Sequence, residues 1–365
     1  MTSDSFILDG YFAGNIGDDL MVLAITRSLP ELTFVVNGAA PASSRALAQE
    51  PNVLLDEGSN FRGRVLIGGS MFIDTRGRSI REYCRHRRLY LARAATGLRH
   101  RILGRPFAII GCNIGPISTP VGRSLFSAVI GSAHIVTVRD GESFELARRW
   151  AKNVSLLPDI VEFWAPPQSN FQGGADATRI LGVSPPPSLV ESEVSAFADL
   201  LIRAASACVE EAGSIDVIRL FGFHAGSTGD SEIVGAIAKA LRGSSIFVEV
   251  VIYDGDVDSF MEKFHACDRI IGARFHSIIL ARRFGIPVVP IAYSSKTSNY
   301  LRTWAPELVV FDRPWLDGSS LAFVQAVGKA TVSFLVLDSV FSPHSEAIQA
   351  LAEWRFAPDA RRGLA

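Results

Sequence analysis

A chain of 365 residues is longer than one ordinary hydrophobic core requires, so we expect two domains. Apolar residues make up 48% of the chain and charged residues 20%, which excludes an intrinsically disordered protein. The net charge of -1 at pH 7 argues against a general nucleic-acid binder.

The cysteines and the N-terminus bear on the cellular compartment. The first residues lack the basic start and long apolar core of a signal peptide, and no apolar run approaches the roughly 20 residues that span a bilayer. The cysteines are scattered, without metal-ligand or disulfide spacing, which fits a reducing compartment. We therefore predict a soluble, cytoplasmic protein without a metal centre. The four cysteines are Cys84, Cys112, Cys208 and Cys267.

The chain opens with a strand, a glycine-containing loop and a helix. The strand is predicted at 6–8 and the helix at 20–28, and the loop between them carries Gly10, Gly14 and Gly17. This spacing is not the dinucleotide fingerprint, and no acidic residue closes the following strand. A nicotinamide site is thus disfavoured.

Two interpretations of this loop remain open. Asp18 and Asp19 favour a helix cap and would repel a phosphate group placed directly against them. The hydroxyl groups of an acceptor sugar are therefore better candidate ligands than a nucleotide. The alternative is a tight turn that ends in an aspartate cap.

Apolar strands alternate with helices through the rest of the chain, and Gly, Arg, Asp or Asn follow many of the strands. Such alternation predicts parallel sheets with helices on both faces and polar residues along one edge. Strands are predicted at 33–36, 53–55, 64–67, 107–111, 135–138, 154–157, 180–183, 215–220, 246–252, 269–273, 286–291 and 307–311. Helices are predicted at 80–98, 123–131, 143–150, 191–211, 231–241, 257–267, 277–284, 319–336 and 345–354, and a turn at 113–116.

A segment rich in proline, glycine and polar residues at 165–175 interrupts this alternation and is typical of a linker. We therefore predict one α/β domain at 1–168 and a second at 169–340, with a ligand site in the cleft between them. A terminal helix within 341–365 is expected to pack back on the first domain.

Positive charge is concentrated between Arg76 and Arg105, where Glu82 is the only acidic residue among ten arginines. Such a run is usually a solvated helix face. The alternative is a surface that contacts anionic lipid head groups or a pyrophosphate-linked acceptor.

The segment from Asp268 to Lys296 carries the most informative junction. Arg274 and His276 follow a buried strand and precede a helix, at the edge where α/β sheets bind ligands. The free N–H groups of the helix add positive potential there. The alternative is that Arg274 pairs with a carboxylate and His276 caps or packs.

Basic side chains follow several of the predicted strands. An arginine fork matches phosphate or carboxylate oxygens, and a histidine transfers protons near neutral pH. Together these residues predict a small, multiply anionic substrate and proton transfer. Metalloprotease, P-loop and nucleophile-elbow motifs are absent from the sequence. The candidates are Arg139, His224, Arg274, His276 and Lys296.

These motifs, in this order, resemble the polysaccharide pyruvyl transferase family over most of the chain. The first is the glycine-containing start that ends in Gly14-Asn15-Ile16-Gly17-Asp18, followed by the glycines near 68 and the Asn113–Pro116 turn. The next are Val138-Arg139-Asp140 with Ser143, and Pro158-Asp159. The most specific is Arg274-Phe275-His276-Ser277, followed by Gly285-Ile286-Pro287-Val288-Val289 and Tyr293-Ser294-Ser295-Lys296.

The resemblance implies two Rossmann-like domains in a GT-B-like arrangement, with an active site in the interdomain cleft. It implies transfer of pyruvate from phosphoenolpyruvate to a sugar, forming a ketal, with no metal or organic cofactor. His276 then corresponds to the catalytic histidine, and Arg274 and Arg139 to donor-binding arginines. Lys296 is added from its charge and position, and Phe275 and Ser277 from the same motif. We predict the acceptor at Gly14, Asn15, Asp18 and His224.

Two other functions remain open at this stage. A GT-B-like glycosyltransferase would use a nucleotide sugar, but 293–298 offers no acidic residue for the ribose. A non-catalytic carbohydrate-binding protein on the same fold would not need Arg274, His276 and Lys296 together. The resemblance implies that the acceptor is a sugar or a lipid-linked oligosaccharide, and the arginine-rich stretch is consistent with contact at the inner face of the membrane.

Overall fold

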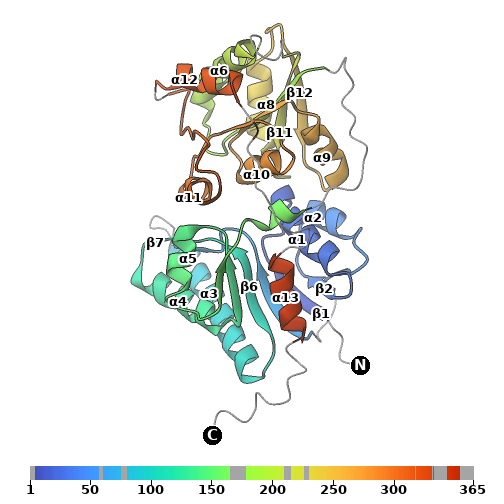
Figure 1. The fold of residues 1–365 in the computed structure, drawn as a ribbon, viewed down its shortest axis with the longest axis vertical. Helices are drawn as coiled ribbons and strands as arrows, with labels where there is room; N and C mark the ends of the chain where they lie inside the picture. The colour runs from blue at the N-terminus through green and yellow to red at the C-terminus, as the bar shows by residue number, and fades with distance from the viewer. Residues whose placement is uncertain are drawn as a thin grey trace.

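The computed structural model describes residues 5–56, 61–74, 80–164, 178–208, 215–225, 230–316, 318–330, 332 and 343–353. Two parallel sheets, each covered by helices, form two halves that face each other (Figure 1). The predicted boundary between 168 and 169 lies outside the described residues, as do 354–365.

The first sheet has seven strands in the order β3-β2-β1-β4-β6-β8-β9, and neighbouring strands are parallel. The strands are β1 (Ser5–Asp9), β2 (Thr33–Val36), β3 (Val53–Leu55), β4 (Gly63–Ile67), β6 (Phe107–Cys112), β8 (Ile135–Val138) and β9 (Val154–Leu156). The helices of this half are α1 (Ile16–Ser28), α2 (Pro41–Leu47), α3 (Ile80–Ile102), α4 (Pro120–Ser132), α5 (Gly141–Ala147) and the 3-10 turn η1 (Ile160–Phe163).

The second sheet has five strands in the order β12-β11-β10-β13-β14, again all parallel. The strands are β10 (Ile180–Ser184), β11 (Val217–Gly222), β12 (Phe247–Ile252), β13 (Arg269–Gly272) and β14 (Val288–Pro290). The helical elements that follow β10 are η2 (Glu191–Glu193), α6 (Val194–Ala207), α8 (Ser231–Ala240), α9 (Val257–His265), α10 (Phe275–Arg283), α11 (Ser295–Trp304), α12 (Ser320–Gly328) and α13 (Pro343–Glu353).

The two sheets share one winding pattern. In each, the first strand lies inside the sheet, and the strand order reverses beside it, between β1 and β4 and between β10 and β13. Ligands of open α/β sheets bind outside the carboxyl ends of the strands at this reversal. The chain therefore has two such crevices, one in each half.

Backbone bonds and buried side chains join the halves at these crevices. The N–H of Ile16 donates to the carbonyl of Phe223 at 3.0 Å, and the N–H of Ala225 donates to Gly14 at 2.8 Å. The Tyr253 hydroxyl donates to the buried carboxylate of Asp19 at 2.6 Å. The N-terminal end of α1 is thereby held against the second half.

The terminal helix α13 lies against the first sheet, where it contacts β6 and α1 (Figure 1). His344 of α13 is fully buried, and its Nε2 lies 2.7 Å from the carbonyl of Pro158. Its Nδ1 lies 2.9 Å from the hydroxyl of Thr137, which itself accepts from the N–H of Gly111. The ring therefore donates from Nε2 and accepts at Nδ1, and burial lowers its pKa to about 4.

Several predicted elements differ in the structure. The expected turn at 113–116 is part of the short strand β7 (Ile114–Ile117), which pairs with β5 (Phe72–Asp74). The expected strand at 307–311 is reduced to a single bridge between Phe311 and Ile291. No helix is predicted between 291 and 307, but Lys296 lies in the first turn of α11 (Ser295–Trp304). The first two differences depend on a pairing partner elsewhere in the chain, which local patterns do not reveal.

No helix within the described parts of the chain is long and apolar enough to cross a membrane. Nor does any group of three or more His, Cys, Asp or Glu side chains in those parts come together to hold a metal ion.

A buried ion pair beneath the interdomain contact yields a stability prediction. Arg282 and Glu162 are both 1% exposed, with 3.2 Å between Nη1 and Oε1. Replacing Glu162 by alanine leaves a buried guanidinium without its counter-ion, so we expect a loss of about 3–5 kcal/mol in the free energy of unfolding. Urea denaturation of wild type and variant measures this change in the free energy of unfolding. Glu145→Ala, which breaks the exposed pair with Arg148, is the control and should cost less than about 1 kcal/mol. Equal losses for both variants would contradict the prediction.

Candidate active site

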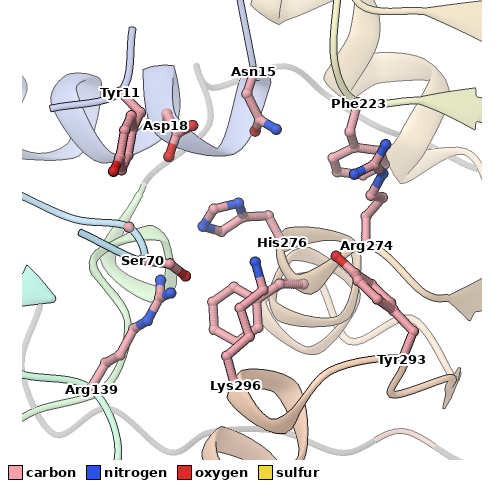
Figure 2. Close-up of a pocket in the computed structure, with 12 residues that line it drawn as sticks. Tyr11, Asn15, Asp18, Ser70, Arg139, Phe223, Arg274, His276, Tyr293 and Lys296 are labelled. Atoms are coloured by element: carbon pink, nitrogen blue, oxygen red, sulfur yellow. The ribbon is translucent and has the colours of Figure 1, made fainter. Parts of the chain in front are cut away.

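A cavity of about 190 Å³ lies between the carboxyl-end loops of the two sheets. Figure 2 shows side chains from both halves directed into it, with His276 in the middle. Its lining consists of Tyr11, Asn15, Asp18, Gly69, Ser70, Arg139, Phe223, Arg274, Phe275, His276, Tyr293 and Lys296.

The N-terminal end of α1 forms one wall. The side chain of Asn15 accepts a hydrogen bond from the N–H of Gly17 at 2.9 Å, so it caps the helix. This cap explains why the helix begins at Ile16 rather than at the predicted Leu20. Asn15 and Asp18 then point from the first turn toward His276 (Figure 2).

Gly17 permits the close approach of the two halves. A Cβ atom at this position would lie 1.7 Å from Nδ1 of His276. No other residue leaves room for the imidazole there, because real Cβ atoms do not make such contacts. The glycine of the Asn15-Ile16-Gly17-Asp18 segment is thus required by a histidine more than two hundred residues later.

His276 is positioned as a neutral base. It lies in the first turn of α10, and its Nε2 is buried without a hydrogen-bond partner in the described parts of the chain. Oδ1 of Asp159 lies 3.9 Å from this nitrogen. Burial lowers the pKa of His276 to about 4; Asp159 opposes this, and the charges of Arg139 and Lys296 add to it. The imidazole is therefore uncharged at neutral pH.

Arg139 and Asp159 form a fully buried ion pair beside the histidine. Nη1 of Arg139 donates to Asp159 at 2.6 Å, and Nη2 donates to the Asn113 side chain at 3.1 Å. The guanidinium also lies 4.3 Å from the ring centroid of Phe275. Although burial acts to raise it, the pKa of Asp159 is lowered by Arg139 and His276, so this carboxylate is ionised.

Arg274 is likewise paired with a carboxylate. It precedes α10 and forms a salt bridge with the buried Asp230, whose other oxygen accepts from the N–H groups of Phe223 and His224. The Nε of Arg274 is buried and has no partner within the described residues. The sequence pattern did not indicate these two partners, because Asp159 and Asp230 are distant along the chain from the arginines; the acid next to Arg139 in the sequence is Asp140.

Lys296 is the least neutralised cation of the site. Within the described parts of the chain its ammonium group forms no salt bridge, and it lies 5.9 Å from the centroid of the Phe275 ring. Burial, followed by the charge of Arg139, lowers its pKa to about 8. A bound anion would restore the counter-charge that the protein does not supply.

Asp18 is the one carboxyl group among the described residues that line the cavity, and its environment favours the protonated form. Burial raises its pKa to about 7, with a further rise from the charge of Asp19, while Lys296 and Arg139 act in the opposite direction. Asp18 is therefore divided between the acid and the carboxylate at neutral pH. His276 and Asp18 have pKa values displaced in opposite directions, which is the pattern of an acid–base pair.

The structure brings most of the predicted site residues together and leaves three outside the lining. Those lining the cavity are Asn15, Asp18, Arg139, Arg274, Phe275, His276 and Lys296. Ser277 is buried and donates to the carbonyl of Arg274, so it holds the helix start. The N–H of Gly14 donates to Ser43, and His224 pairs with Asn15 through the backbone.

Sequence reasoning missed five lining residues and the two carboxylates behind the arginines. A sequence pattern could have pointed to Asp159, since Pro158-Asp159 follows a predicted strand as Arg139-Asp140 does. No such pattern marks Asp230, because only the fold brings it to Arg274. The missed lining residues are Tyr11, Gly69, Ser70, Phe223 and Tyr293.

A second cavity of about 170 Å³ adjoins the first and shares Lys296 with it. It lies between β7, α4, α5 and α11 and mixes amide, carboxylate, guanidinium and apolar groups. Its lining comprises Asn113, Ile114, Gly115, Pro116, Ile117, Arg123, Asp140, Glu142, Leu146, Ser295, Lys296 and Asn299.

Solved structures share this architecture along almost the whole chain. The UDP-GlcNAc 2-epimerase from Methanocaldococcus jannaschii has a TM-score of 0.59 at 8% identity, covering 95% of this chain and 98% of its own. A putative UDP-N-acetylglucosamine 2-epimerase from Listeria monocytogenes has a TM-score of 0.56 at 10% identity, with 97% and 96% covered. Anabaena HepE, in complex with UDP and glucose, has a TM-score of 0.53 at 12% identity, with 96% and 95% covered. The protein therefore has the GT-B fold of glycosyltransferases and epimerases.

Within that class, the chain belongs to the polysaccharide pyruvyl transferase family, whose model matches residues 15–295. This range includes every lining residue of the central cavity except Tyr11 and Lys296. No curated protein matches the sequence. The predicted family and fold are thus confirmed, and the protein is a member of a transferase family.

The raised pKa of Asp18 predicts a pH-dependent cost to stability. The ordinary pKa is 3.8, so between pH 3.8 and about 7 the folded state binds more protons than the unfolded state, and stability falls as the pH rises. Asp18→Asn removes this cost, which is about 1–3 kcal/mol after allowance for partial exposure. We expect a higher melting temperature than wild type above pH 7 and no difference below pH 3.8.

Differential scanning fluorimetry across this pH range measures the effect. Asp258→Asn is the matched control, because Asp258 is also in the first turn of a helix, α9, but is exposed. A gain for Asp258→Asn equal to that of Asp18→Asn, or a gain independent of pH, would contradict the prediction.

Proposed function

We propose that the protein transfers pyruvate from phosphoenolpyruvate to a sugar of a polysaccharide or its precursor, forming a ketal and releasing phosphate. The observation that carries this proposal is the central cavity, where Arg139, Arg274 and Lys296 surround a neutral histidine. A small ligand with two anionic groups complements such a cavity.

The donor is proposed to bind against the second half. Phosphoenolpyruvate carries a phosphate and a carboxylate, and desolvating both requires several opposed cations. Lys296 has no salt-bridge partner in the described residues, and Nε of Arg274 is buried and unpaired there, so both have bonding capacity for a ligand. Arg139 lies with Lys296 over the Phe275 ring, which supports both cations.

Ketal formation requires two sugar hydroxyls and balanced proton transfers. A proton adds to the methylene carbon of the donor, a first hydroxyl adds to the neighbouring carbon, phosphate departs, and a second hydroxyl takes its place. The two hydroxyls lose two protons in all. One of these balances the proton that was added to form the methyl group, and the other leaves with the phosphate. The steps use only phosphoenolpyruvate, the sugar and the side chains of the protein.

Asp18 and His276 are the proposed acid and base. Protonated Asp18 would give its proton to the methylene carbon, and neutral His276 would accept the proton of the first hydroxyl. His276 would then protonate the departing phosphate, and Asp18 would regain its proton from the second hydroxyl. Both groups end each cycle as they began it. The acceptor is accordingly placed on the side of Asn15 and Asp18.

Ligand binding separates this function from its alternatives. We expect phosphoenolpyruvate to raise the melting temperature, because a ligand that binds only the folded state stabilises it.

Arg274→Ala should weaken phosphoenolpyruvate binding by about tenfold to a hundredfold, as expected for loss of a charged hydrogen bond. Isothermal titration calorimetry measures the affinity, with Arg302→Ala as an exposed control near the cleft. A rise in melting temperature with UDP-sugars but not with phosphoenolpyruvate would favour a glycosyltransferase and contradict the proposal.

Catalysis is tested at His276 and at the glycine beneath it. With phosphoenolpyruvate and an acceptor both supplied, His276→Ala should lower the rate of phosphate release by about 10²–10⁴. Gly17→Ala should have a comparable effect, since its Cβ would displace the imidazole. Gly235→Ala is the matched control, because a Cβ on this α8 glycine meets nothing within 4 Å. Near wild-type transfer by His276→Ala, with its fold verified by circular dichroism, would remove the histidine from the mechanism.

A further inference from the structure

The long helix α3 (Ile80–Ile102) presents a face that the central site does not use. It packs against α4 on the outer side of the first sheet (Figure 1). Its inward side chains include Tyr90, which is 2% exposed and stacks edge-on against Phe126 of α4. The opposite side of the helix faces solvent.

Large apolar side chains lie on that solvent face. Leu91 is 57% exposed, Leu98 is 55% and Ile102 is 75%. Their spacing of i, i+7 and i+11 places them on one stripe of an α-helix. Single exposed apolar residues are common, whereas three aligned on one helix face indicate an interaction surface.

Arginines lie beside this stripe on the same exposed side of the helix, rotated from it by about 60–120°. Arg81, Arg85 and Arg88 line one hollow of the surface near the N-terminal end, and Arg99 is exposed next to the apolar stripe. Glu82 is the only acidic residue in the sequence of α3. The exposed face therefore combines a basic half and an apolar half along about 34 Å of helix.

This combination fits the surface of an anionic bilayer. Apolar side chains enter the boundary between head groups and acyl chains, while arginines attract the lipid phosphates. A second copy of the chain related by a two-fold axis would bring two arginine-rich faces together without acidic partners. A nucleic acid would match the arginines and leave the leucines exposed.

We propose that the exposed face of α3 docks the protein on an anionic membrane surface through Arg81, Arg85, Arg88, Leu91, Leu98 and Ile102. The inference goes beyond the proposed transfer reaction and does not depend on it. If both hold, the docking face belongs to the same half as Asn15 and Asp18, the proposed acceptor side of the central cavity, so a lipid-linked acceptor would approach that side from the membrane.

Vesicle co-sedimentation of the full chain tests the proposal without catalysis. We expect binding to vesicles of phosphatidylcholine with phosphatidylglycerol, none to phosphatidylcholine alone, and release by high salt. Arg81→Ala/Arg85→Ala/Arg88→Ala should lose about tenfold or more in vesicle binding. Leu91→Glu/Leu98→Glu should lose a comparable amount, because glutamates both remove apolar contact and repel the lipid.

Two control variants match these in number and exposure. Arg203→Ala/Lys239→Ala/Arg242→Ala removes three exposed cations of the second half, and Leu316→Glu/Leu321→Glu alters leucines that are 53% and 67% exposed. Both controls should bind vesicles as wild type does. Phosphoenolpyruvate calorimetry on all variants should be unchanged, so failure of vesicle binding is distinguishable from failure of the transfer reaction.

Several outcomes would overturn the proposal. One is equal binding to both vesicle types, and another is an equal loss in the control variants. Absence of vesicle binding combined with a dimer that Leu91→Glu/Leu98→Glu converts to a monomer, as measured by light scattering, would assign the face to a second copy. Retention on random-sequence RNA without vesicle binding would assign it to nucleic acid.

Discussion

The buried contact among Arg139, Asp159 and His276 is the interaction on which the site depends. Asp159 follows the last strand of the first sheet, accepts a bond from Arg139, and lies 3.9 Å from a histidine of the second half. An isolated charge at this depth would be costly, so each partner requires the others. Moving the halves apart would separate His276 from Asp159 and return its imidazole to water, where its pKa would rise toward the ordinary value.

The same packing explains how a cavity rich in cations can remain folded. Two of its arginines are neutralised by Asp159 and Asp230, and only the ammonium of Lys296 has no salt bridge within the described residues. Among the described residues the site thus keeps the ammonium of Lys296 without a salt bridge, beside Asp18, whose raised pKa of about 7 lets it keep part of its proton at neutral pH. Such a site is prepared for an anionic ligand and proton transfer, and the packing of the two halves maintains it without a bound ligand.

Most of the sheet could be predicted because buried parallel strands are nearly continuous apolar runs. All six positions of β6 and of β11 are buried, and both strands were predicted within two residues. The site was predictable where a polar residue follows such a strand, as for Arg139, Arg274 and His276. Predictions were wrong where a short segment gains its structure from a distant partner, as for β7, which pairs with β5.

The sequence by itself determined the α/β class, the alternation of strands and helices, and the strand ends that carry Arg139, Arg274 and His276, because these follow from local hydrophobic periodicity. Only the tertiary structure decided what those residues contact. Gly17 is required because a histidine from the other half occupies the space of its side chain, and Asp18 holds its proton because burial and neighbouring charge act together. Steric exclusion and electrostatic coupling act between atoms that are close in space, whatever their separation along the chain.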